Sequence, residues 1–141
     1  MLKTFVIPLL AALTLASQQS SDPWPGPALL RPLDLVSAKP QPPIFYVGFP
    51  ILYRGAHIQN AVLAGPGSKP EGLEALTKAL RPLPRDREIV LYCGCCPFDK
   101  CPNIRPAYRT AAGLGFTHIK VLVLKTNLHT DWTAKGYPTS R

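Results

Sequence analysis

Short apolar segments separated by loops and helical stretches dominate the hydrophobic pattern of this 141-residue chain. Residues 44–47, 61–65, 87–93 and 118–124 have the length of strands, and residues 87–93 and 118–124 carry the strongest signals. Continuous apolar segments of this length, bounded by polar or turn-forming residues, are typical of buried strands. The pattern therefore predicts four strands, and residues 44–47 and 118–124 have the pattern of buried strands.

Helical periodicity appears between and after these strands. Residues 68–80 place Leu73, Leu76 and Leu80 on one face, with Ser68 as a candidate cap and Pro70 in the first turn. Strands that alternate with helices predict an α/β fold with a mostly parallel sheet.

Two further helices are predicted in the second half of the chain. The first covers residues 102–115, with Asn103 as a candidate cap and glycine at its exit. The second is a short helix over residues 128–136. Residues 49–60 show neither period and are predicted to form a loop or turn region.

The N-terminal region has the pattern of an export signal. Lys3 precedes an uncharged apolar run at residues 5–16, which is too short to span a bilayer comfortably. We therefore expect a signal peptide at residues 1–17, a flexible leader at 18–29 and one domain at 30–141. This organisation predicts a periplasmic or secreted protein with no stable membrane insertion after cleavage.

The charge balance favours anionic partners. Lysine and arginine outnumber aspartate and glutamate by 16 to 8, so the formal net charge is +8. No run of basic residues and no interleaving of basic with aromatic residues occurs, which argues against a nucleic-acid partner.

All four cysteines lie within residues 91–103 as Cys93, Cys95, Cys96 and Cys101. Cys93 ends a predicted strand, and the next helix starts about ten residues later. Sites in parallel sheets form at the carboxyl ends of the strands. A helix N-terminus nearby stabilises a thiolate and accepts oxyanions. Cys93 is therefore the candidate nucleophile.

Several motifs occur in the order found in a known family. They are the strand ending in Cys93, the Gly-Leu-Gly-Phe of residues 113–116, the strand at 118–124, Asp131-Trp132 and Gly136-Tyr137-Pro138. Residues 53–61 match an upstream family motif at Tyr53, His57, Ile58 and Ala61. In these features the chain resembles a rhodanese-like domain.

The resemblance implies a three-layer α/β fold, with a central mostly parallel sheet flanked by helices, and a sulfurtransferase activity of the thiosulfate type. Cys93 would carry sulfane sulfur as a persulfide between a small sulfur-containing anion and a thiol acceptor. Lys100, Arg105 and Arg109 are candidate substrate-binding cations. No cofactor is implied.

The chain also departs from the family pattern. Tyr46 and Gly48 stand where an acidic and a basic residue are usual, and Lys125-Thr126-Asn127 replaces a glycine pair. The loop after Cys93 is longer and holds three extra cysteines. The sixth residue after Cys93 is Asp99 rather than arginine, which disfavours the chemistry of related phosphatases.

Three alternatives to sulfur transfer stay open. The thiolates could bind zinc, copper(I) or an iron–sulfur centre, but the spacing C-x-C-C-x4-C lacks paired C-x2-C arms, so we expect no dedicated metal site. Cys95, Cys96 and Cys101 could be redox or resolving thiols, with Cys95 or Cys96 paired to Cys101. The domain could also be an inactive binding module.

Export makes the first testable prediction. The mature protein should begin between about residues 17 and 22, because cleavage follows the apolar run. N-terminal sequencing of exported material checks this, and exported protein that still began at Met1 would contradict it.

Overall fold

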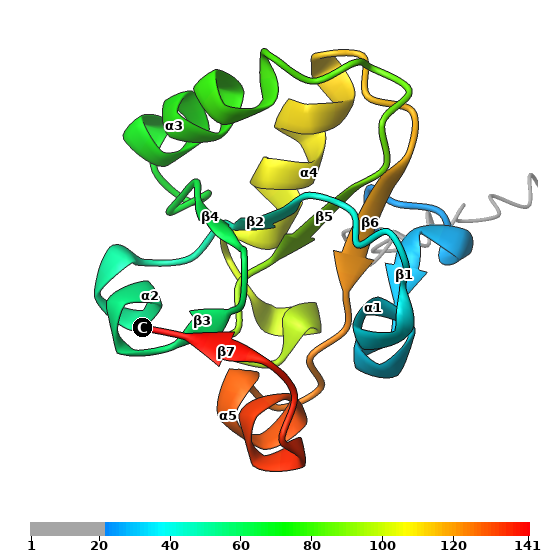
Figure 1. Ribbon diagram of the computed structural model, residues 1–141. Helices are drawn as coiled ribbons and strands as arrows, with labels where there is room; N and C mark the ends of the chain where they lie inside the picture. Colours follow the sequence, from blue (N-terminus) through cyan, green and yellow to red (C-terminus); the bar gives the residue numbers. More distant parts are fainter. Residues whose placement is uncertain (1–21) are drawn as a thin grey trace, which may run out of the picture.

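A five-stranded parallel sheet forms the centre of the computed structural model, which describes residues 22–141 (Figure 1). The strand order is β1-β6-β5-β2-β4, and each neighbouring pair is parallel. The bounds are Leu29–Leu30 (β1), Ile44–Tyr46 (β2), Val62–Leu63 (β4), Ile89–Tyr92 (β5) and Ile119–Leu122 (β6). The signal peptide expected at residues 1–17 lies outside the described residues.

The central strands are apolar at nearly every position because both faces of the sheet are covered. All four residues of β5 are fully buried, and its side chains alternate between two cores. Ile89 and Leu91 belong to one core, while Val90 and Tyr92 belong to the other. The four predicted strands are confirmed, each somewhat shorter than its apolar segment.

Two long helices cover one face of the sheet (Figure 1). These are α3 (Pro70–Leu80) and α4 (Ile104–Gly113), both expected from the sequence. Leu76 and Leu80 from α3 and Ala107 and Ala111 from α4 are fully buried beneath them. The small side chains of α4 allow its backbone to approach the sheet closely.

Shorter helices cover the opposite face. They are α1 (Pro32–Ser37), α2 (Pro50–Gly55) and α5 (Leu128–Asp131), the last followed by the 3-10 turn η3 (Thr133–Lys135). Leu35 and Trp132 from this layer pack with Tyr46 and Tyr92 of the sheet. The molecule therefore has three layers, and the predicted α/β class with a mostly parallel central sheet is confirmed.

A two-stranded ribbon closes this second layer. It pairs His57–Ile58 (β3) antiparallel with Thr139–Ser140 (β7). The pairing brings the C-terminal end of the chain beside α2 (Figure 1). The remaining short elements are the 3-10 turns η1 (Gly26–Ala28) and η2 (Phe98–Lys100).

Three local expectations differ from the structure. Helices α1 and α2 were not expected, because six residues make fewer than two turns and show no usable period. Residues 49–60, expected as loop or turn, hold α2 and β3. Ser68 does not cap α3: Lys69 occupies the cap position, and the backbone N–H of Ser68 donates to Asn103 Oδ1 at 3.0 Å.

The described part of the expected leader is packed against the domain. Trp24 is 7% exposed, and its ring meets Tyr108 edge-on at 5.6 Å. Arg105 lies over Trp24 and donates from Nε to Asp22 at 2.9 Å. Strand β1 pairs with β6. Residues 22–29 therefore belong to the folded domain rather than to a flexible leader.

Within residues 22–141, none of the helices combines the length and the apolar composition that crossing a bilayer requires.

Replacing Trp24 tests the packing of this segment. Trp24→Ala should lower the free energy of unfolding by about 3 kcal/mol, because it removes a large buried side chain and leaves a cavity. Urea denaturation of the reduced protein measures the change. The matched control Phe49→Ala, at a site 37% exposed, should cost less than about 1 kcal/mol. Equal stability of Trp24→Ala and wild type would contradict the packing of this segment.

Candidate functional site

Cys93 is the first residue after β5, at the carboxyl end of the central strand. The neighbouring strands β2 and β6 run in the same direction, so the loops that follow all three meet at this edge. Cys93 is 4% exposed. It lines a cavity of about 390 Å³ that opens at this edge of the sheet.

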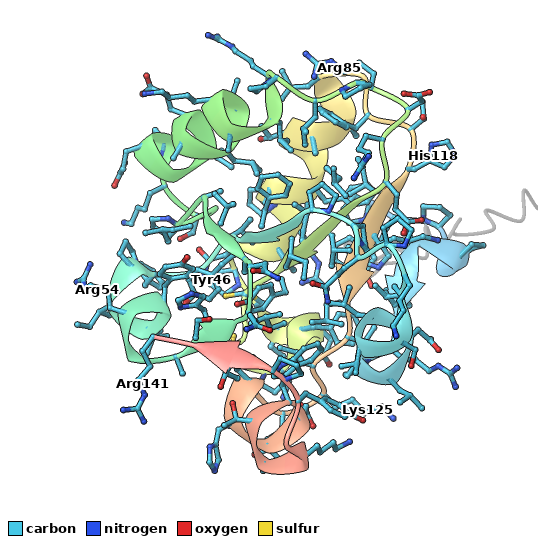
Figure 2. The ribbon with its side chains drawn as sticks, viewed as in Figure 1. Tyr46, Arg54, Arg85, His118, Lys125 and Arg141 are labelled. Carbon is cyan, nitrogen blue, oxygen red and sulfur yellow. The ribbon has the colours of Figure 1, made fainter. Side chains whose placement is uncertain are left out.

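The cavity draws its walls from distant parts of the chain. Tyr46 comes from β2, Leu52 and Ala56 from the α2 region, Asn127, Leu128 and His129 from the start of α5, and Arg141 from the C-terminal end. Cys93, Gly94 and Cys95 also line it. Tyr46 lies inside the molecule, whereas the side chain of Arg141 extends outward beyond β7 (Figure 2).

Asn103 holds Cys93 in place. Its side chain is fully buried, and Nδ2 donates to Cys93 Sγ at 3.3 Å. Oδ1 accepts the backbone N–H of Ser68, so one side chain joins three loops. The expected role of Asn103 as a side-chain cap of α4 is wrong, because it makes no such hydrogen bond. The sequence shows only an asparagine before a helix and no sign of this contact.

Gly48 is required by the crowding around Cys93. A β-carbon at this position would lie 2.5 Å from the Tyr46 hydroxyl and 3.1 Å from Cys93 Sγ. The Tyr46 hydroxyl donates to the Phe49 carbonyl at 3.1 Å. The absence of the usual charged pair at positions 46 and 48 therefore has a steric reason: an aromatic ring fills the space and leaves none for a side chain at 48.

The four thiols form one cluster. Cys93 Sγ lies 3.3 Å from Cys95 Sγ, which lies 2.9 Å from Cys96 Sγ. The sulfurs of Cys93, Cys95 and Cys101 all lie within 4.8 Å of one another. All four cysteines are free thiols. The loop thus gathers every cysteine of the chain at one point.

Negative charge in this cluster is most stable on Cys101. A hydrogen bond from Cys93, together with backbone N–H groups of Asn103 and Ile104, lowers the pKa of Cys101 to about 6 despite its burial. Hydrogen bonding to Cys101 and burial raise the pKa of Cys93. Burial raises the pKa of Cys96 to about 12. Cys93 and Cys101 form a pair that shares one proton. At neutral pH this proton resides on Cys93 and the negative charge on Cys101.

This distribution corrects one expectation. The start of α4 was expected to stabilise the thiolate of Cys93, but its amides point at Cys101. Cys93 instead receives the backbone N–H of Cys95 and the side-chain amide of Asn103. The loop between Cys93 and α4 is long enough to place a second cysteine at the helix start.

The three candidate cations lie away from the cavity. Lys100 and Arg109 are exposed, and neither lines it. Arg105 is engaged by Asp22 and Trp24 on the α4 side of the sheet. The basic side chains that do line the cavity are His129 and Arg141. Sequence reasoning missed Arg141 because only the pairing of β7 with β3 brings it there.

The segment that replaces the family's glycine pair has a structural role. The Asn127 side chain accepts from the Thr130 N–H at 2.8 Å and so caps α5. The backbone N–H groups of Thr126 and Asn127 both donate to Asp131. These bonds orient the start of α5, which supplies one wall of the cavity.

His57 and Trp132 have structural roles. The His57 ring stacks on Tyr53 at 3.7 Å and donates from Nδ1 to the Tyr53 carbonyl. Trp132 is 1% exposed and donates from Nε1 to the Pro138 carbonyl. Both side chains hold the β3–β7 ribbon against the domain.

The sulfurs of Cys93, Cys95 and Cys101 also form a donor set that suits a thiophilic metal ion once the thiols lose their protons. The expectation of no dedicated metal site stays a prediction.

Solved structures confirm the rhodanese-like resemblance at the level of the fold. The Rhodanese_3-like domain of the Alr3790 protein from Anabaena sp. is 25% identical, with a TM-score of 0.53 over 71% of this chain and 99% of that one. A second structure of that protein's rhodanese-like domain is 24% identical, with a TM-score of 0.52 over 71% of this chain and 81% of the other.

A structure of the Alr3790 protein itself is 22% identical, with a TM-score of 0.59 over 79% of this chain and 90% of that one. No protein-family model and no curated protein matches the sequence.

The proton shared by Cys93 and Cys101 leads to a testable prediction. Because the pKa of Cys101 is lowered to about 6, one thiolate should persist at neutral pH and disappear as the pH falls through that value. The ultraviolet thiolate absorbance of the reduced protein measures this step. Cys101→Ser should remove it, and Cys93→Ala should move it to higher pH, because Cys101 then loses a hydrogen-bond donor.

Cys96→Ser keeps a hydrogen-bond donor beside Cys101, so as the matched control it should leave the step in place. A first step near the ordinary thiol pKa of about 8.5 in the wild type would contradict the assignment.

Proposed function

We propose that this chain, a rhodanese-like domain by its fold, is an exported sulfurtransferase that carries sulfane sulfur as a persulfide on Cys93. One observation carries the proposal. Cys93 ends the central strand, lines the cavity and receives a hydrogen bond from the buried Asn103 side chain. Such donors stabilise both the attacking thiolate and the persulfide anion that replaces it.

The first half-reaction loads the carrier. The Cys93 thiolate attacks the outer sulfur of a donor such as thiosulfate, the sulfur–sulfur bond of the donor breaks, and sulfite leaves. The proton of Cys93 moves to Cys101, whose sulfur lies within 4.8 Å of Cys93 Sγ and carries the negative charge of the pair. Cys101 thus acts as the proton acceptor that makes Cys93 nucleophilic at neutral pH.

The second half-reaction removes the sulfur from Cys93. The outer sulfur of the persulfide passes to a thiol acceptor, and Cys93 returns as a thiolate. Arg141 lines the cavity and adds a permanent positive charge at its edge, whereas Lys100, Arg105 and Arg109 do not line it. The net charge of +8 attracts such anions to the domain in general.

Export is the cellular part of the proposal. The apolar run at residues 5–16 supports a periplasmic or secreted protein. The proposal involves no nucleic acid, no resident cofactor and no stable membrane insertion after cleavage.

Binding of a thiophilic metal is the second candidate function, favoured by the three sulfurs that lie within 4.8 Å of one another. A metal held by Cys93, Cys95 and Cys101 would occupy the proposed nucleophile, so the two functions exclude each other at one time.

Sulfur transfer from thiosulfate to cyanide under reducing conditions tests the main proposal. Cys93→Ser should lower the rate at least about a thousandfold, because a serine hydroxyl cannot carry sulfane sulfur. Cys96→Ser, which removes a thiol that does not line the cavity, is the control and should retain activity.

Full activity in Cys93→Ser, with loss in Cys96→Ser or Cys101→Ser, would place the nucleophile elsewhere. A wild type that is inactive with every common donor would favour a binding module. Stoichiometric zinc, copper or iron by elemental analysis, released by Cys101→Ser, would favour the metal site.

A further inference from the structure

The turn at Gly94 brings two thiols together at the cavity. Gly94 has φ +77°, a left-handed conformation that side chains rarely adopt. A β-carbon there would lie 3.1 Å from the Leu128 β-carbon, and the Gly94 carbonyl accepts the Leu128 N–H at 3.0 Å. The chain therefore folds back tightly between Cys93 and Cys95, and their sulfurs approach to 3.3 Å.

Cys95 differs from the other two loop cysteines, Cys96 and Cys101. Of the four cysteines in the chain, Cys93 and Cys95 line the cavity, whereas Cys96 and Cys101 do not. Cys101 is 2% exposed and lies just before the start of α4, outside the lining of the cavity. Cys95 is half-buried, so it combines contact with Cys93 and access to the cavity.

We propose that Cys95 resolves the Cys93 persulfide by attacking Cys93 Sγ, forming a Cys93–Cys95 disulfide and releasing hydrosulfide into the cavity. The proposal rests on the sulfur-carrier function of Cys93. A bond forms between the two cysteine sulfurs, and the bond from Cys93 Sγ to the outer sulfur breaks. The outer sulfur takes the bonding electron pair and the proton of Cys95 and leaves as HS⁻. The two cysteine thiols are oxidised, and the sulfane sulfur is reduced to sulfide.

The geometry favours attack by Cys95 over attack by a free thiol from solution. The two cysteine sulfurs are already within the distance of about 3–3.5 Å that characterises near-attack arrangements. A thiol held in contact reacts at an effective concentration far above that of a free thiol in solution. The outer sulfur has the cavity as its exit.

A consequence is dependence on an external reductant. Each resolution leaves the site as a disulfide, so another turnover requires a dithiol or monothiol reductant to reopen it. The domain would then convert sulfane sulfur and thiol reducing equivalents into hydrosulfide. In the absence of reductant it would stop after one turnover.

Single-turnover loading tests the proposal. Wild type, Cys93→Ser, Cys95→Ser, Cys96→Ser and Cys101→Ser are reduced, freed of reductant without oxygen and treated with thiosulfate or a small organic persulfide. Released hydrosulfide, free thiols and intact mass are followed over time. Wild type should release about one equivalent of hydrosulfide per chain and lose two thiols, as the reaction stoichiometry requires.

Cys95→Ser should instead accumulate the mass of one added sulfur on Cys93 and release hydrosulfide at least about tenfold more slowly. Cys95→Ala should behave in the same way, which excludes an effect of the serine hydroxyl. Cys96→Ser is the matched control and should release hydrosulfide like the wild type. Cys101→Ser should load more slowly and still release hydrosulfide.

Peptide mapping identifies the disulfide. Trypsin cleaves after Arg87 and Lys100, so Cys93 and Cys95 fall in one peptide and Cys101 in the next. In the Cys96→Ser background, the expected product is a loop within residues 88–100, two mass units lighter than its reduced form. A cross-link to the peptide that contains Cys101 would overturn the assignment to Cys95.

Two failures are distinguishable. Sulfur addition to Cys95→Ser with hydrosulfide release at the wild-type rate would overturn resolution by Cys95 and leave the sulfurtransferase proposal standing. Sulfur addition to neither the wild type nor Cys95→Ser, with either donor, would overturn both.

Discussion

The buried side chain of Asn103 is the interaction on which the site depends. It donates to Cys93 Sγ at the end of β5 and accepts from the Ser68 N–H in the segment before α3, while its own backbone begins α4. Gly67 approaches so closely that a β-carbon there would lie 2.2 Å from the Asn103 carbonyl oxygen. An unpaired buried amide is costly, so each of these three segments is held in register with the other two.

The same region decides where charge resides. The sulfurs of Cys93 and Cys101 lie within 4.8 Å of each other, and two buried thiols this close do not both ionise. The pair therefore shares one proton and one charge. The amides at the start of α4 place the charge on Cys101, and the proton then lies on Cys93 beside the cavity. The cluster thus separates the thiol that stores the negative charge from the thiol that meets the substrate. Cys95, on the cavity side of Cys93, is left free to react with what Cys93 carries.

The strands are apolar because they are buried on both faces. For the same reason β2, β5 and β6 could be predicted from the sequence. Helices α3 and α4 could also be predicted, because each is long enough for its buried face to give a helical period in the sequence. Helices α1 and α2 are too short for a period. Trp24 lies in a proline-rich segment with no pattern of its own, and its burial comes from Tyr108 and Arg105, more than 80 positions away along the chain.

By itself the sequence determined the α/β class, the three central strands and the position of Cys93 at a strand end, because these depend on local composition and spacing. Only the tertiary structure decided which side chains surround Cys93. Tyr46 ends β2, Asn103 begins α4 and Arg141 follows β7, and their convergence depends on strand order and on the β3–β7 pairing. It likewise decided that Cys101 rather than Cys93 receives the helix amides, and that Lys100, Arg105 and Arg109 lie outside the cavity. The direction in which a loop side chain points is set by contacts between distant segments, and no local pattern records such contacts.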